Sequence, residues 1–87
     1  MIQITLNNAD TVDLFVSAVD NNQPGTPTVF PIQRLNQGQS SVPFGVQEDG
    51  NGRFSITTTA TDVNDATRTK AAQATGGAGD SVDVRCS

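Results

Sequence analysis

Apolar and polar residues alternate along most of this chain. Five runs show the alternation, at residues 2–6, 12–18, 42–46, 54–56 and 82–86. Successive side chains of a β-strand point to opposite faces, so such runs predict strands with one buried face and one wet face. Phe15 has the opposite parity to the apolar residues of its run, which indicates an outer-face position.

A sixth apolar stretch, at residues 29–32, contains a proline. Proline cannot donate a hydrogen bond to a neighbouring strand, so we expect an edge strand or a kink there. The gaps between the runs are rich in turn-forming residues. Residues 7–10 are expected to turn the first strand back on itself, and Pro24-Gly25 suits the centre of a type II turn. Residues 49–52, Asp-Gly-Asn-Gly, predict a tight hairpin between the runs on either side.

The segment at residues 62–79 allows more than one interpretation. A helix capped by Asp65 would contain no large apolar side chain, so little would attach it to a core. The interpretation we prefer is an edge strand at residues 66–72, in which Arg68 and Lys70 discourage pairing with other molecules. Disorder is the third alternative.

The strands recur at intervals of roughly 10–14 residues with turns between them, which is typical of sandwiches and small barrels. No helical pattern is long enough for the crossovers of a parallel sheet. We therefore predict an all-β fold: a small antiparallel β-sandwich of six or seven strands, immunoglobulin-like, in a single domain over residues 1–87.

The predicted core is thin. Twenty of the 87 residues are Ile, Leu, Val or Phe, whereas 31 are Thr, Ser, Asn or Gln. This apolar content lies just above the floor of roughly 20% below which chains usually stay disordered. Since so small a core has little stability to spare, we expect burial against a protein partner or self-association.

The composition argues against several functions. The chain has no histidine and one cysteine, so a Ser-His-Asp or Cys-His arrangement cannot form and zinc or copper sites lack ligands. We therefore expect no enzyme activity. The net charge of −4 argues against a nucleic-acid partner. No apolar run is long enough to span a membrane, and we expect neither a signal peptide nor a membrane-surface segment.

The single cysteine, Cys86, cannot form an internal disulfide. Its parity matches that of Val82 and Val84, so we expect a small buried residue. An intermolecular disulfide is the alternative. A catalytic thiol is not expected, because no base is present to activate it.

Acidic and amide side chains in the predicted loops suggest one candidate metal site. Calcium takes six to eight oxygen ligands, and loops at one end of a sandwich can supply them. The candidate ligands are Asp20, Asn22, Asp62 and Asp65, with Asp13, Asn21 and Asn64 nearby. The alternative is that Asp and Asn simply form turns there.

Two functions follow from these observations. The first is a non-catalytic interaction or structural module that binds protein or assembles with copies of itself. The second is a carbohydrate-binding module, assisted by calcium, which would use the abundant amides. Sugar sites usually also need an aromatic platform, and this chain has no Trp or Tyr and only four Phe.

Overall fold

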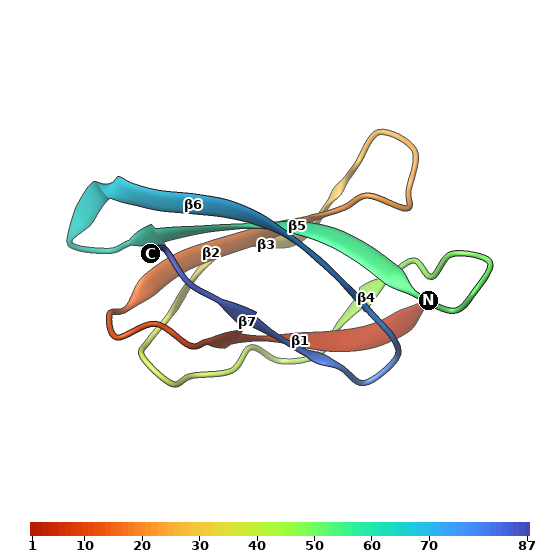
Figure 1. Ribbon diagram of the computed structural model, residues 1–87, viewed down its shortest axis with the longest axis horizontal. Coiled ribbons are helices and arrows are strands. Elements are labelled where there is room, and N and C mark those ends of the chain that lie inside the picture. Colours follow the sequence, from red (N-terminus) through yellow and green to blue (C-terminus); the bar gives the residue numbers. More distant parts are fainter.

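The computed structural model describes all 87 residues and contains seven strands and no helix. The strands are β1 (Ile2–Asn8), β2 (Leu14–Asp20), β3 (Thr28–Leu35), β4 (Phe44–Val46), β5 (Phe54–Asp62), β6 (Asp65–Gly76) and β7 (Ser81–Val84). Figure 1 shows them stacked in two layers. No long apolar helix of the kind that crosses a bilayer is present.

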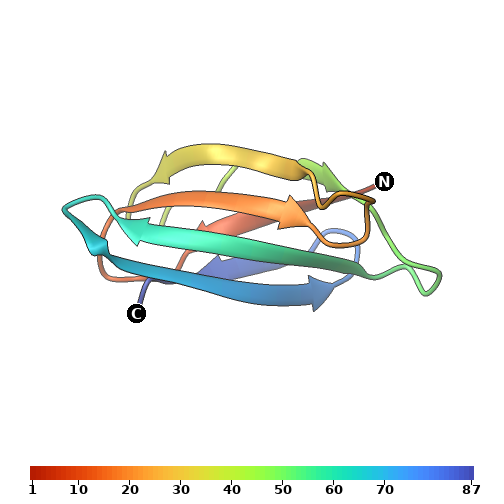
Figure 2. The same ribbon diagram turned by 90° about the horizontal axis from the view of Figure 1, so that it is seen from above.

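The two layers are a three-stranded sheet of order β4-β1-β7 and a four-stranded sheet of order β3-β2-β5-β6. Figure 2 shows the larger sheet lying across the smaller one. This arrangement confirms the predicted all-β sandwich. One ladder departs from the antiparallel expectation, since β1 and β7 run parallel. Parallel strands need a long connection, and here strands of the opposite sheet supply it without a helix.

One hydrophobic core lies between the sheets, as the alternating pattern predicts. β2 and β5 each bury every second side chain and direct the others outward. The buried core cluster comprises Ile4, Leu6, Leu14, Val16, Ala18, Phe30, Leu35, Val46, Phe54, Ile56, Ala60, Val84 and Cys86. The inward position of Cys86 is therefore confirmed.

Two predicted turns do not join paired strands. Residues 49–52 do form a tight turn, in which the Asp49 carboxylate accepts hydrogen bonds from the backbone N–H groups of Asn51 and Arg53. However, β4 pairs with β1, whereas β5 pairs with β2 and β6. The predicted hairpin is therefore wrong, because this loop crosses between sheets. Residues 7–10 likewise lead from β1 into the other sheet.

The third alternating run is shorter than predicted. Only Phe44–Val46 forms a strand, and the Val42 side chain is exposed. Ser41 takes the buried position instead, and its Oγ accepts a hydrogen bond from the backbone N–H of Leu6. Pro43 directly precedes β4 and has no N–H to donate, so regular pairing begins only after it.

The segment at residues 62–79 contains the strand β6, Asp65–Gly76, which is longer than the 66–72 stretch we predicted. The helical alternative is wrong. β5 and β6 form a hairpin that turns through residues 63–64, and the Asp62 carboxylate accepts a hydrogen bond from the backbone N–H of Asn64. This short turn holds β6 against β5 where a helix would have lacked any apolar contact.

A buried polar cluster attaches the C-terminus to the loop between β1 and β2. The Asp10 carboxylate accepts hydrogen bonds from the backbone N–H groups of Cys86, at 2.9 Å, and Thr11, at 2.7 Å. These bonds, that of Cys86 first, lower the pKa of Asp10 from 3.8 to about 2. Burial raises the pKa of the Cys86 thiol, and the Asp10 carboxylate adds to the effect.

The lowered pKa of Asp10 predicts a loss of stability in acid. Unfolding returns this carboxyl to its ordinary pKa, so its contribution is complete above about pH 4 and disappears as the pH falls toward 2. We expect Asp10→Asn to lower the free energy of unfolding by about 1–2 kcal/mol at pH 6. Urea unfolding at each pH tests this: the curves of the variant and the parent should converge near pH 2. A constant offset from pH 6 to pH 2 would contradict the assignment.

Candidate functional site

The residues predicted to bind calcium fall into two groups at opposite ends of the larger sheet. Asp20 pairs with Ile56 across the β2–β5 ladder, and Asp62 pairs with Leu14. Ile56 and Asp62 are six positions apart along β5, a span of roughly 20 Å. Asn22 lies with Asp20, and Asp65 lies with Asp62. The expected convergence of these loops is therefore wrong, and the four residues cannot ligate one ion together.

Each of these acidic residues instead holds its own turn. The buried Asp20 carboxylate accepts hydrogen bonds from the backbone N–H groups of Asn22 and Gln47 and from the side chain of Gln23. Asp65 accepts hydrogen bonds from the N–H and the hydroxyl of Thr67, which lower its pKa. These contacts match the turn-forming alternative. The chain contains no cluster of three acidic or thiol side chains placed to hold a metal.

The features expected of a sugar site are dispersed. Phe15 is on an outer face, as predicted, with 39% of its surface exposed. The other three Phe residues lie in the core or pack against it. Asn21 and Asn22 are hydrogen-bonded to Thr57 and to the Gln47 carbonyl, respectively. The surface has no pocket in which these groups meet.

The most unusual feature of the molecule is the free edge of β6. The opposite side of the sandwich is closed, because β3 and β4 pack together there and the ring centroids of Phe30 and Phe44 lie 5.0 Å apart. β6 pairs with β5 along one side only, and nothing pairs with its other side. Figure 2 shows this strand as the long outermost element of its sheet.

The direction of the β6 backbone groups follows from the ladder. The Ser55 carbonyl accepts a hydrogen bond from Asn21, so it points toward β2. The backbone N–H and C=O groups of successive residues point to opposite sides of a strand. Those of the even-numbered residues of β5 therefore point toward β6, and those of their β6 partners point back toward β5. The backbone N–H and C=O groups of the odd-numbered residues of β6 therefore point away from β5, toward the free edge. Those with both N–H and C=O groups free at the edge are Thr69, Ala71, Gln73 and Thr75.

The two edges of this sheet differ in their protection. The outer edge strand β3 contains Pro31, and its ladder with β2 is irregular in two places. Prolines and bulges of this kind hinder pairing with another molecule. β6 contains no proline, and its only irregularity lies beside Asp62, at the hairpin turn. Its long central stretch is therefore a regular template for a further strand.

The side chains on the inner face of β6 form a graded row. Reading along the strand, Arg68 and Lys70 are followed by Ala72, Ala74 and Gly76. Ala74 is half-buried against the core, whereas the first three are exposed. Gly76 is buried against the Phe54 ring, which a Cβ atom at this position would approach to 2.8 Å. The row thus changes from cationic to small and apolar.

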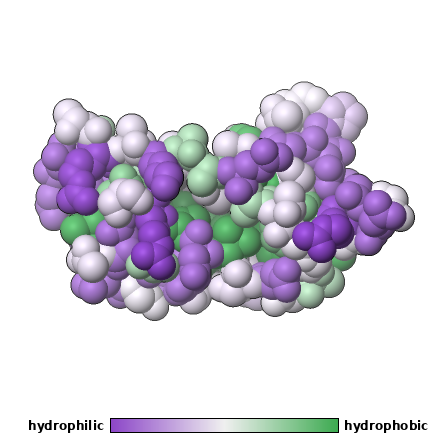
Figure 3. Space-filling view, viewed as in Figure 1, coloured by the Kyte–Doolittle hydropathy of each residue, from purple (hydrophilic) through white to green (hydrophobic).

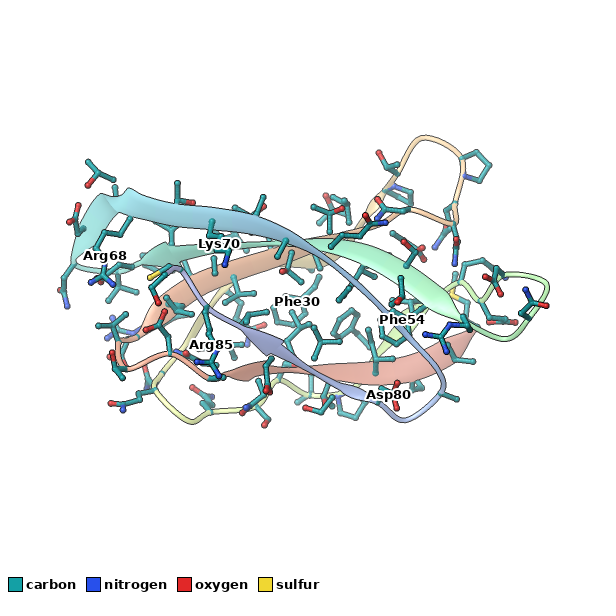
Figure 4. The ribbon with its side chains drawn as sticks, in the orientation of Figure 1. Phe30, Phe54, Arg68, Lys70, Asp80 and Arg85 are labelled. Atoms are coloured by element: carbon teal, nitrogen blue, oxygen red, sulfur yellow. The ribbon has the colours of Figure 1, made fainter.

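Three of the five cationic side chains of this acidic protein lie at this side of the sandwich. Of the five cationic side chains, Arg68 and Lys70 belong to β6, and Arg85 directly follows the facing edge strand β7 (Figure 4). Arg68 contacts Asp62 at 3.2 Å, but Lys70 and Arg85 form no ion pair. Figure 3 shows apolar surface between the polar residues on this side.

Comparison with known proteins adds nothing to this geometry. The chain matches no protein-family model, no curated protein and no solved structure. The candidate site therefore depends on the structure alone.

The sequence indicated part of this site. Arg68 and Lys70 were predicted to lie on an edge strand and to discourage pairing. The position of Arg85 was not predicted, because no pattern in the sequence shows that the end of β7 lies at the same side as β6. The alternation at residues 82–86 signals only that Arg85 is exposed.

Proposed function

We propose that this chain is a non-catalytic β-sandwich module that binds other protein chains or copies of itself, and that β6 is its binding edge. One observation carries the proposal: the free backbone groups of Thr69, Ala71, Gln73 and Thr75 lie in a row on a regular strand with exposed side chains. An added strand satisfies such groups by main-chain hydrogen bonds, while its side chains provide specificity.

The energetics favour this mode of binding over a pocket. Each main-chain hydrogen bond contributes about 0.5–1.5 kcal/mol net, so a partner that satisfies the row gains several kcal/mol before it makes any side-chain contact. The surface has no pocket to compete with this edge. The thin core adds support, because a further strand would extend the buried surface. The absence of histidine supports a non-catalytic role.

We also propose an immunoglobulin-like classification for the sandwich. In such domains the C′, C, F and G strands form one sheet, and B pairs with E in the other. The order β3-β2-β5-β6 and the pair β1–β4 correspond to these sets. β7 occupies the place of strand A, beside strand B, and it runs parallel to β1.

Proline scanning of the edge tests the proposed function. The probe is a peptide of alternating valine and threonine, mixed with the protein at rising concentration in sedimentation velocity runs. We expect a complex with the peptide, or between copies of the chain, that Ala71→Pro abolishes, because this change removes an edge N–H and adds a bulky ring.

The matched control is Ala78→Pro. This residue lies in the exposed turn between β6 and β7, which the hydrogen bond from the Asp80 N–H to the Gly77 carbonyl closes. Proline fits the second position of such a turn, so binding should persist. If no strand-forming peptide, neutral or acidic, and no second copy binds, or if Ala71→Pro binds as the parent does, the proposed function is wrong.

A further inference from the structure

We infer that the partner strand at β6 is an acidic amphipathic segment, with small apolar residues at one end and carboxylates at the other. The inference rests on the proposed function and adds the chemical class of the partner. Three features carry it: the graded inner face of β6, the Lys70 ammonium group, which has no ion-pair partner, and the apolar surface between the two sheets.

The positive charge of Lys70 at this edge disfavours the binding of neutral strands. Lys70 points inward from β6, since its partner Ala60 is buried in the core. Natural sheets use inward-pointing charges to prevent edge pairing. An approaching neutral strand would bring an apolar or hydroxyl side chain beside Lys70 and remove water from its ammonium group. A carboxylate at the same place supplies a partner for that charge.

The neighbouring Arg68 extends this preference. The Arg68 guanidinium already contacts Asp62 and has further N–H donors to offer. Two carboxylates spaced two residues apart on a bound strand would lie beside Lys70 and Arg68, on the same face of the sheet.

The other half of the edge favours small apolar side chains. Ala72 and Ala74 have little bulk, and Ala74 and Val82 are only partly buried against the core. Alternate apolar side chains of a bound strand would cover this surface. A strand antiparallel to β6 would therefore carry its apolar residues toward its N-terminus and its acidic residues toward its C-terminus.

A second copy of the chain fits less well. Antiparallel pairing of two β6 strands brings the cationic half of each opposite the Ala72–Gly76 half of the other, so Arg68 and Lys70 would gain no carboxylate partner. The only acidic residue of β6 is Asp65, which belongs to the hairpin turn. The charge complementarity that an acidic segment offers is absent from this pairing.

Three peptides of one design test the inference by calorimetry and fluorescence anisotropy. Each has alternate valines in its N-terminal half, and at the alternate positions of its C-terminal half it has Glu, Gln or Lys. We expect the Glu peptide to bind about fivefold tighter than the Gln peptide and at least tenfold tighter than the Lys peptide. The preference should largely vanish near 1 M salt.

Charge reversal supplies the decisive variant. In Lys70→Glu the Glu peptide should lose its advantage and the Lys peptide should gain affinity. Arg53→Glu is the matched control, because this exposed cation lies in the loop between β4 and β5, and it should leave the order of the three peptides unchanged. Circular dichroism confirms that both variants are folded.

The outcomes separate the two claims. Equal binding of the Glu and Gln peptides, or an unchanged order in Lys70→Glu, overturns the acidic partner and leaves edge binding intact. A self-complex that Ala71→Pro abolishes and the Glu peptide does not displace makes a second copy the occupant, and overturns the inference. If no peptide binds and no self-complex forms, both claims are wrong.

Discussion

Ala72→Pro is expected to destabilise the protein strongly, whereas Ala71→Pro at the adjacent position is expected to be tolerated. The N–H of Ala72 faces Thr58 across the β5–β6 ladder, so proline removes a ladder hydrogen bond and pushes its ring toward β5. We expect a loss of about 2–4 kcal/mol of unfolding free energy. The N–H of Ala71 faces solvent, where proline is accommodated in edge strands, so the loss should be at most about 1 kcal/mol.

Urea unfolding followed by circular dichroism measures both variants. Intrinsic preference cannot explain a difference, because both positions are exposed alanines in the same strand. The difference in unfolding free energy between the two variants therefore reports only whether the N–H group at each position faces β5 or solvent. If Ala71→Pro were the less stable variant, the backbone groups of the odd-numbered residues would be the ones paired with β5. The proposed binding edge would then be wrong.

Asp20→Ala is expected to cost about 2–4 kcal/mol of unfolding free energy. This carboxylate is fully buried and accepts hydrogen bonds at 2.7 Å from the Gln47 N–H and at 3.0 Å from the Asn22 N–H. Alanine leaves both donors without this partner, at about 1–3 kcal/mol each. Relief from burying a carboxylate offsets part of that cost. The expected loss is a large fraction of the total stability of a domain this small.

Asp83→Ala is the control for Asp20→Ala. Asp83 is exposed on β7 and accepts one hydrogen bond, from the Asn7 amide, at 3.1 Å. We expect its loss to change the unfolding free energy by no more than about 0.5 kcal/mol. Thermal unfolding of the two variants side by side checks the difference. Similar midpoints for both would contradict the structural role assigned to Asp20.

The sequence predicted the strands well, because the side chains themselves encode a two-residue period. β1, β2 and β5 bury every second side chain, most of them apolar, and Pro31 indicated an edge strand or a kink at β3. The partners of each strand were harder to predict. The turn at residues 49–52 is encoded locally by the Asp49 carboxylate, but nothing local states which sheet the next strand will join.

The candidate site was predictable only in part. Arg68 and Lys70 indicated an edge strand, because charged side chains at such positions discourage pairing with other molecules. The free backbone groups of β6 depend on its register with β5, and register is a property of two segments together. The distance between Asp20 and Asp62 is likewise set by the length of β5. Two acidic residues that both follow a predicted strand therefore lie at opposite ends of the sheet.

Amide hydrogen exchange along β6, followed by NMR, tests the binding edge most directly. In the free protein, the amides of Lys70, Ala72 and Ala74 should be protected, and those of Thr69, Ala71, Gln73 and Thr75 should exchange rapidly. Saturation with the Glu peptide should slow the second group at least tenfold and leave the first unchanged. Rapid exchange of the second group in the saturated complex, or new protection confined to other strands, would contradict binding at this edge.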